Sequence, residues 1–290
     1  MPAAIAHEQR QYATYLLSQS EPDSLLEVVP ERGGIALRWQ FQGKEIFYLD
    51  AERFKDPTLS VRGGNPILFP ICGNLPDNTY THNGQSYQLK QHGFARELPW
   101  QVSPLTDEAS GKLVLSLESN DQTRAVYPFE FYLAFSYQLV GNQLLTTQTV
   151  TNPSTEALPF SLGFHPYFLV DDKSQLRFDI PACELIDQKT KIAHAFAGEF
   201  DLSQDELDLI FPTLTRSSAH VVDLQQGIRL TLDFSDAYRN LVFWTVKGKP
   251  FYCLEPWTAG RNAMNTGDRL IALEPGASFT AFVNFTIEPW

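Results

Sequence analysis

The sequence predicts an all-β protein, a large antiparallel β-sandwich formed by one domain over residues 1–290. Two observations support this fold class. Strand-length segments that alternate apolar and polar positions recur along the chain between Gly, Pro, Asn and Asp residues. Long helical periodicity is nearly absent, so strands do not alternate with helices as they do in a parallel α/β sheet.

The predicted strands follow one another along most of the chain. Residues 24–49 alternate apolar and polar positions over short segments broken by Pro30, Gly33 and Gly43, as in antiparallel strands joined by tight turns. Further segments of strand length, rich in β-branched and aromatic residues, are LVLSLES (113–119), FYLAFSYQLV (131–140), LLTTQTVTN (144–152), IRLTLDF (228–234), LVFWTV (241–246) and FTAFVNFTI (279–287).

Only two segments, residues 4–18 and 201–210, are predicted to be helical. The second begins with acidic residues, which suit the positive end of a helix dipole. Residues 56–100 are irregular and contain many Pro and Gly residues. We expect this stretch to be a long functional excursion from the sheets, because loops hold functional residues more often than strands do.

Composition and charge exclude several classes of function. The chain has 22 Lys and Arg against 34 Asp and Glu, a net charge of -12, which disfavours binding to nucleic acid or to an anionic membrane. No apolar run of about 18 residues predicts a membrane span, and the N-terminus does not resemble an export signal. The 3 cysteines form no CxxC motif and favour a reducing compartment, so a cytoplasmic location is expected.

Two segments of the irregular stretch contain cationic and imidazole groups. In VRGGNPILFP (61–70), Arg62 precedes two glycines, and a guanidinium beside glycines can approach a hydroxyl-rich or phosphorylated ligand closely. In QHGFAR (91–96), Arg96 is expected to keep His92 neutral, so that His92 serves as a hydrogen-bond partner. The structural alternatives are a solvated arginine in a turn and a loop histidine bonded to backbone.

Two later segments contain candidates for proton transfer. His165, in LPFSLGFHPYF (158–168), follows an apolar strand and precedes Pro166. Glu255, in FYCLEPW (251–257), ends an apolar run, where burial should raise the pKa of its carboxyl toward neutrality, as a general base needs. A core histidine at a strand end is the alternative for His165. Glu274 is expected at an exposed turn.

Other chemistries have weaker support in the sequence. His92 and His165 lie in no HExxH, HxH or Cys/His cluster, so no metal site is expected. The sequence contains no GxSxG segment and neither a dinucleotide-binding nor a P-loop motif. Proton transfer without a bound cofactor is the chemistry that remains.

The RGG, HGFAR, FHPYF and LEPW elements, in this order, resemble those of the aldose 1-epimerase (galactose mutarotase-like) family, particularly its hexose-phosphate mutarotase-like and LacX-like branch. The resemblance extends from about Glu27 to Ile287. It implies a β-supersandwich with a sugar in a cleft on its concave face. The partner it implies is a small-molecule sugar or sugar phosphate, bound by a monomer or a homodimer.

The resemblance also assigns roles to residues. It implies that Glu255 is the general base and His165 the general acid, and that His92 and Arg62 bind the substrate. Arg96 matches the arginine that follows HGFA in the sugar-phosphate branch and is expected to be a further substrate-binding residue. An aspartate that holds sugar hydroxyls is expected between His165 and Glu255. Asp208 is the best candidate by position, with Asp201 and Asp205 as alternatives, all from the segment 201–208.

The implied reaction is interconversion of the α and β anomers of a hexose or hexose 6-phosphate by ring opening and reclosure. We expect His165 and Glu255 to lie on opposite sides of one pyranose, across a sugar-sized gap. The alternatives are a non-catalytic carbohydrate-binding or sugar-sensing protein and an accessory domain of a glycosidase. Phe69, Phe94, Tyr167 and Trp257 are expected to stack on the sugar or, more often, to pack in the core.

Overall fold

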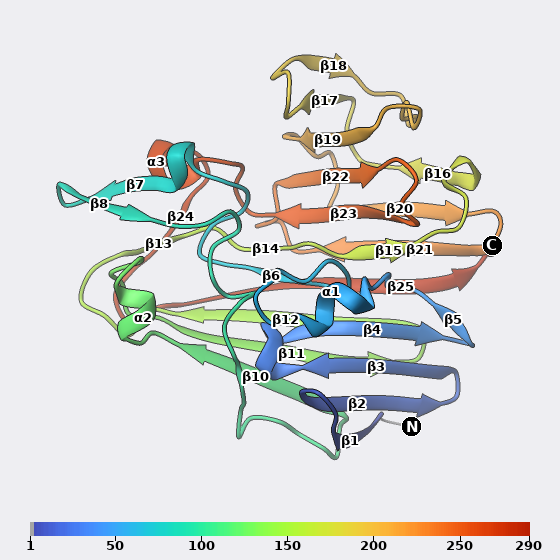
Figure 1. The fold of residues 1–290 in the computed structure, drawn as a ribbon, viewed down its shortest axis with the longest axis horizontal. Helices are drawn as coiled ribbons and strands as arrows, with labels where there is room; N and C mark the ends of the chain where they lie inside the picture. Colours follow the sequence, from blue (N-terminus) through green and yellow to red (C-terminus); the bar gives the residue numbers. More distant parts are fainter. Residues whose placement is uncertain (1–2) are drawn as a thin grey trace.

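The computed structural model describes residues 3–290, which form antiparallel sheets with few short helices (Figure 1). The first sheet contains, in spatial order, β1 (Ala4–Gln9), β2 (Ala13–Ser20), β3 (Asp23–Val29), β4 (Ile35–Phe41) and β5 (Lys44–Glu45). It confirms the strands predicted over 24–49. The helix predicted over 4–18 is wrong, because this segment is a hairpin in which Ala4 lies opposite Ser18.

The second sheet has eight strands and contains five of the predicted ones. Its spatial order is β16 (Leu176–Asp179), β20 (Ser218–Asp223), β21 (Ile228–Phe234), β25 (Ser278–Pro289), β12 (Gln143–Thr151), β11 (Tyr132–Val140), β10 (Lys112–Glu118) and β9 (Gln101–Val102). Buried and half-buried residues alternate along β12, as expected for a strand with one face on the core.

The third sheet positions the candidate site. Its spatial order is β18 (Ala193–Ala195), β17 (Glu184–Asp187), β19 (Glu206–Phe211), β22 (Asn240–Val246), β23 (Phe251–Trp257), β14 (Gly163–Phe164) and β6 (Ile67–Leu68), and β15 (Tyr167–Leu169) also pairs with β23. The strand predicted over 241–246 is confirmed. The helix predicted over 201–210 is wrong, because ELDLIF pairs with β22 and buries Leu207 and Leu209 on one face.

The remaining elements are small. Two further two-stranded antiparallel sheets are the long-range pair of β13 (Leu158–Phe160) with β24 (Ile271–Leu273) and the hairpin of β7 (Thr79–His82) with β8 (Gln85–Gln88). The helices are α1 (Ala51–Lys55), α2 (Asp121–Arg124) and α3 (Ala263–Thr266), with 3-10 turns at Pro30–Arg32, Pro76–Asn78 and Lys173–Gln175. None of the helices within residues 3–290 has the length and apolar character needed to cross a membrane.

Aromatic rings from different sheets meet in the interior. Phe285 on β25 lies 6.4 Å, centroid to centroid, from Trp39 on β4 and 6.0 Å from Phe168 on β15. Phe135 on β11 likewise lies 6.0 Å from Phe164 on β14. The first and third sheets therefore pack against the second, in front of which they lie in Figure 1. This arrangement is the predicted antiparallel sandwich.

Candidate active site

A cleft of about 280 Å³ lies beside the third sheet, and all six predicted site residues line it. Its size is close to the lower end of the range of roughly 300–1,000 Å³ for small-ligand sites, so it suits one small molecule. The lining residues are Ser60, Val61, Arg62, Gln91, His92, Arg96, His165, Tyr167, Glu206, Asp208, Val242, Trp244, Glu255, Trp257 and Arg261.

His165 and Glu255 face each other because of the register of β23. Strand β15 pairs with β23 with Tyr167 opposite Cys253, and β14 continues the same antiparallel register. That register places residue 165 opposite residue 255. Side chains that are directly opposite on paired strands point to the same side of the sheet and touch. The sequence-distant acid–base candidates therefore become nearest neighbours.

The two side chains form a buried pair on one wall of the cleft. Nε2 of His165 lies 3.4 Å from Oε1 of Glu255, and the indole N–H of Trp257 donates to Oε2 at 3.1 Å. His165 is 8% exposed and Glu255 is 1% exposed. The expectation that they lie on opposite sides of a sugar is therefore wrong. They are adjacent because paired strands hold them there, so a ligand must lie over both groups rather than between them.

Burial shifts the pKa values of Glu255 and His165 in opposite directions. It raises the pKa of Glu255 well above its ordinary value, and the charge of Asp208 raises it further, as expected for a general base. Burial, followed by the charge of Arg96, lowers the pKa of His165 to about 3. Burial therefore favours the neutral forms of the Glu255 carboxyl and the His165 imidazole over the ion pair of carboxylate and imidazolium.

His92 is held in one tautomer by backbone. The N–H of Gly73 donates to Nδ1 of His92 at 3.1 Å, so the neutral imidazole has its proton on Nε2. Burial and then the charge of Arg96 hold the pKa of His92 well below its ordinary value, which confirms the expected neutral form. Nε2 of His92 also lies 3.3 Å from the side-chain amide of Gln91, so Gln91 and a ligand in the cleft are both candidates to accept this proton.

Arg62 is placed by close backbone packing. A Cβ at Gly63, which has a φ of 141°, would lie 2.6 Å from Cα of Leu49. A Cβ at Gly64 would lie 2.6 Å from the carbonyl oxygen of Ala36. The two glycines therefore allow two backbone segments to pack closely together, whereas we expected them to allow a ligand to approach Arg62. Arg62 itself is exposed and faces the cleft.

Arg96 is a largely buried cation with unused hydrogen-bonding capacity. One Nη2 proton goes to the carbonyl of Gln91 at 2.9 Å, while its buried Nε has no hydrogen-bond partner. Burial lowers the pKa of Arg96. In the described part of the chain, neither Arg62 nor Arg96 has a carboxylate within ion-pair distance. Two guanidiniums are therefore available to an anionic or hydroxyl-rich ligand.

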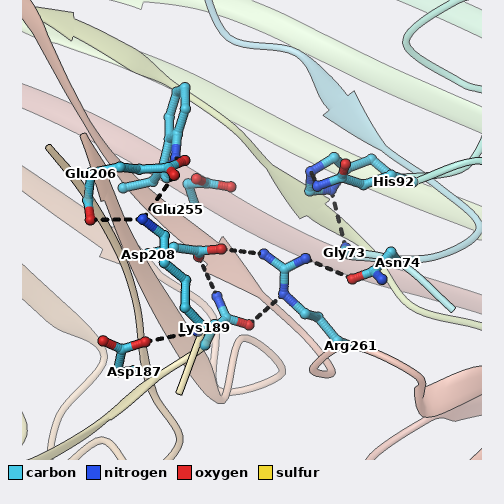
Figure 2. Close-up of polar contacts among 12 residues, drawn as sticks. Gly73, Asn74, His92, Asp187, Lys189, Glu206, Asp208, Glu255 and Arg261 are labelled. Atoms are coloured by element: carbon cyan, nitrogen blue, oxygen red, sulfur yellow. Dashed lines mark hydrogen bonds and ion pairs between the residues drawn. The ribbon is translucent and has the colours of Figure 1, made fainter. Parts of the chain in front are cut away.

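Asp208 is the aspartate that reaches the cleft. It lies on β19, where Oδ2 accepts from Arg261 at 2.8 Å and Oδ1 accepts from Gln188 at 2.6 Å (Figure 2). Asp201 caps its own turn through Ser203, and Asp205 does not line the cleft. Among the three alternatives, position on a strand beside the cleft selects Asp208.

Two of the four aromatic candidates line the cleft. Tyr167 stacks on His165 at 4.8 Å, and Trp257 lies edge-on to His92 at 5.5 Å. Phe69 is fully buried in the core, and Phe94 borders a separate cavity of about 550 Å³. Core packing thus accounts for Phe69, as the composition favoured.

Sequence reasoning missed several residues that line or support the cleft. Trp244 donates to Glu206 at 2.8 Å, Arg261 pairs with Asp208, and Gln188 bonds to both members of that ion pair. A weak signal existed for Arg261, since the cation follows LEPW closely in a short polar segment. Gln188 has no local pattern that marks it.

Cys253 lies beside the pair: ligand atoms of His165, Cys253 and Glu255, all three buried, lie within 4.8 Å of one another. Burial raises the pKa of the Cys253 thiol well above its ordinary value. Cys72 and Cys253 are free and buried, and Cys183 is free and exposed.

Fold and site together define an antiparallel β-sandwich protein with a buried carboxyl–imidazole pair in an arginine-lined cleft. Residues 16–286 match the sequence model of the aldose 1-epimerase family, and the chain belongs to that family.

Three relatives illustrate the range of similarity. The chromosomal protein LacX of Lactococcus lactis subsp. lactis is 29% identical over 238 residues, which cover 72% of this chain and 78% of LacX. The crystal structure of Slr1438 from Synechocystis sp. PCC 6803 has 46% identity and a TM-score of 0.94, with 97% of each chain covered. A galactose mutarotase-like protein from Clostridium acetobutylicum shares the fold at 20% identity, with a TM-score of 0.82 and coverage of 100% and 99%.

Proposed function

We propose that this protein is an aldose 1-epimerase that interconverts the α and β anomers of a hexose or a hexose 6-phosphate. The observation that supports this most directly is the pair of His165 and Glu255, whose nitrogen and oxygen lie 3.4 Å apart on one wall of a cleft of small-molecule size. The family membership supports the same reaction class.

The side-by-side arrangement of the pair suits this chemistry. The anomeric hydroxyl oxygen and the ring oxygen of a pyranose are bonded to the same carbon, so a base for one and an acid for the other must also be neighbours. Glu255 removes the proton from the anomeric hydroxyl, and His165 gives a proton to the ring oxygen. The bond between C1 and the ring oxygen breaks, which leaves an aldehyde. After rotation about C1–C2, the reverse transfers close the ring on the other face.

One mobile proton is sufficient for this cycle. Ring opening begins with the carboxylate and imidazolium form of the pair and ends with the neutral carboxylic acid and neutral imidazole. Burial favours the neutral form, as the raised pKa of Glu255 and the lowered pKa of His165 indicate. The N–H of Trp257 and the charge of Arg261 stabilise the carboxylate that starts the reaction.

Two unpaired guanidiniums support a phosphorylated substrate. Arg62 and Arg96 line the same cleft as the acid–base pair, and guanidinium binds phosphate oxygens through two parallel hydrogen bonds. A relative from Cenchrus ciliaris, provisionally named a glucose-6-phosphate 1-epimerase, is 28% identical over 192 residues, 62% of this chain and 55% of that protein. His92 and Asp208 would hold the sugar hydroxyls.

The decisive experiment is Glu255→Gln, which keeps the side-chain shape and removes the base. We expect anomer exchange to slow by roughly a hundredfold to ten-thousandfold. Exchange is followed by polarimetry on freshly dissolved α-glucose and α-galactose and by exchange NMR on glucose 6-phosphate. Glu274→Gln is the matched control, since Glu274 lies exposed at the turn where the sequence predicted it. A variant as fast as the parent protein would exclude Glu255 as the base.

The second candidate function is sugar binding without turnover. It predicts that the parent protein binds a hexose by calorimetry but leaves the rate of anomer exchange at its uncatalysed value. Glu255→Gln would then change affinity alone.

A further inference from the structure

Arg261 lines the cleft, but sequence analysis assigned no role to it. It follows β23 and reaches three acceptors with three different nitrogens (Figure 2). Nη2 donates to Oδ2 of Asp208 at 2.8 Å, Nε to Oε1 of Gln188 at 2.5 Å and Nη1 to Oδ1 of Asn74 at 2.7 Å. A side chain with this many directed contacts is fixed in position.

These contacts close a ring around Asp208. Gln188 accepts from Arg261 and donates to Oδ1 of Asp208 at 2.6 Å, so each carboxylate oxygen has one protein donor. A carboxylate can accept about four hydrogen bonds, so lone pairs remain for a ligand. Asp208 thus faces the cleft in a fixed orientation.

The fold makes room for this arginine. A Cβ at Gly73, which has a φ of +72°, would lie 2.4 Å from Cγ of Arg261. The guanidinium carbon lies 6.0 Å from the ring centre of Trp257. Gly73 is also the residue whose N–H fixes the tautomer of His92. Arg261 is therefore packed against groups that support both the imidazole and the carboxylate of the site.

Asp208 and Arg261 act on Glu255 with opposite signs. The charge of Asp208 raises the pKa of Glu255, and the charge of Arg261 lowers it. The other titratable or polar groups that interact with Glu255 are Arg96, His165, Tyr167, Cys72, Cys253 and the N–H of Trp257. If Arg261 were removed, the negative charge of Asp208 would have no counterion there and would raise the pKa of Glu255 more strongly.

We infer that Arg261 is a positioning residue for proton transfer, which orients Asp208 toward the sugar hydroxyls and cancels the charge that Asp208 exerts on Glu255. This inference rests on the proposed function for its sugar ligand, but its electrostatic part concerns two carboxyls and one guanidinium of the protein alone. The two parts can therefore be tested separately.

The electrostatic part is tested by titrating Glu255 directly. The protein is labelled with 13C at glutamate carboxyls, and the signal of Glu255 is assigned by its absence in Glu255→Gln. We expect Arg261→Met to move the midpoint of Glu255 to higher pH by on the order of one pH unit, a tenfold change in proton affinity. Arg261→Lys keeps the charge and should move it less. Thermal unfolding followed by circular dichroism establishes that each variant is folded.

The double variant separates charge cancellation from general structural damage. In Arg261→Met with Asp208→Asn, the uncancelled charge is gone, so the midpoint should return to the parent value or fall below it. If the titration midpoint of Glu255 in the double variant equals that in Arg261→Met, the inference is overturned, because the shift then comes from altered packing and not from the charge of Asp208. An unchanged midpoint in Arg261→Met would overturn it as well.

The orienting part is tested with a sugar that cannot react. Binding of 1,5-anhydroglucitol or its 6-phosphate, whichever the parent protein binds, is measured by calorimetry. We expect Arg261→Met, Arg261→Lys and the double variant all to bind on the order of tenfold more weakly, because each loses the fixed carboxylate. Parent-like affinity in Arg261→Met would refute the orienting role. Failure of the proposed function can be distinguished from failure of this inference, because neither the titration of Glu255 nor the binding measurement requires catalytic turnover.

Discussion

Residue 165 lies opposite residue 255 in the register that joins β14 and β15 to β23, and this places Nε2 of His165 3.4 Å from Oε1 of Glu255. The contact is therefore a property of strand pairing rather than of flexible loops. Backbone hydrogen bonds fix the main chain at both residues, and the N–H of His165, between β14 and β15, donates to the carbonyl of Pro66 at 3.0 Å. A site on rigid elements keeps its groups within the tolerance that proton transfer needs.

The register depends on a close approach at Gly163, which gives the first prediction. A Cβ there would lie 2.8 Å from Sγ of Cys72 and 2.9 Å from Cδ1 of Trp257. Gly163→Ala should therefore lower the free energy of unfolding by about 1–3 kcal/mol, measured by urea denaturation. Gly260→Ala is the matched control, because its Cβ would meet only Ile210, at 3.7 Å. Equal stability of the two variants would contradict the tight packing at Gly163.

The lowered pKa of His165 predicts a loss of stability in acid. Its folded-state pKa of about 3 lies below the ordinary value of 6.5, so His165 stabilises the fold above pH 6.5 and this contribution falls as the pH drops toward 3. The slope is at most about 1.4 kcal/mol per pH unit.

Replacement of His165 by Asn should make the unfolding free energy less dependent on pH between 6.5 and 4. The measurement is urea denaturation at both pH values. His7→Asn, on the exposed strand β1, should keep the pH dependence of the parent. If the His165 and His7 variants lose stability in acid equally, the buried imidazole is not responsible.

The hydrogen bond from Trp257 predicts a shift in the pH profile of activity. In the proposed mechanism, the pair is active when its two groups share one mobile proton. Activity should therefore fall in acid, where the pair gains a second mobile proton, and in alkali, where it loses the first. The indole N–H lowers the pKa of Glu255. Trp257→Phe should consequently move the alkaline decline in kcat/KM to higher pH, seen by polarimetry after subtraction of the uncatalysed rate. A shift to lower pH would contradict the assignment.

The two unpaired arginines predict a dependence on the phosphate of the substrate. Arg62→Met and Arg96→Met should each raise KM for glucose 6-phosphate by roughly 10- to 150-fold, the range for a lost hydrogen bond to a charged group. KM for free glucose should change much less. Lys90→Met removes an equal charge from the same stretch of chain but outside the cleft lining, and should leave both constants unchanged. Equal effects on both sugars would make the arginines hydroxyl ligands instead.

The local sequence pattern predicted strands correctly where one face of the strand is buried against the core, because such burial requires apolar and polar residues to alternate. Residues 131–140 and 144–152 have a period of two because one face of each strand is buried, and the structure confirms both as β11 and β12. The segment 4–18 lacks such a pattern because β1 is almost wholly exposed. Its strand form comes from pairing with β2, which is a tertiary property.

By itself, the sequence determined the sandwich class, the four segments that contribute Arg62, His92, His165 and Glu255, and the rise in the pKa of the buried carboxyl. These follow from periodicity and from residue types, which are local. Only the tertiary structure decided that His165 and Glu255 are neighbours on one wall of the cleft, and that Arg261 forms an ion pair with Asp208. Both depend on which strands pair and in what register, and long-range pairing leaves no mark in the composition of either strand alone.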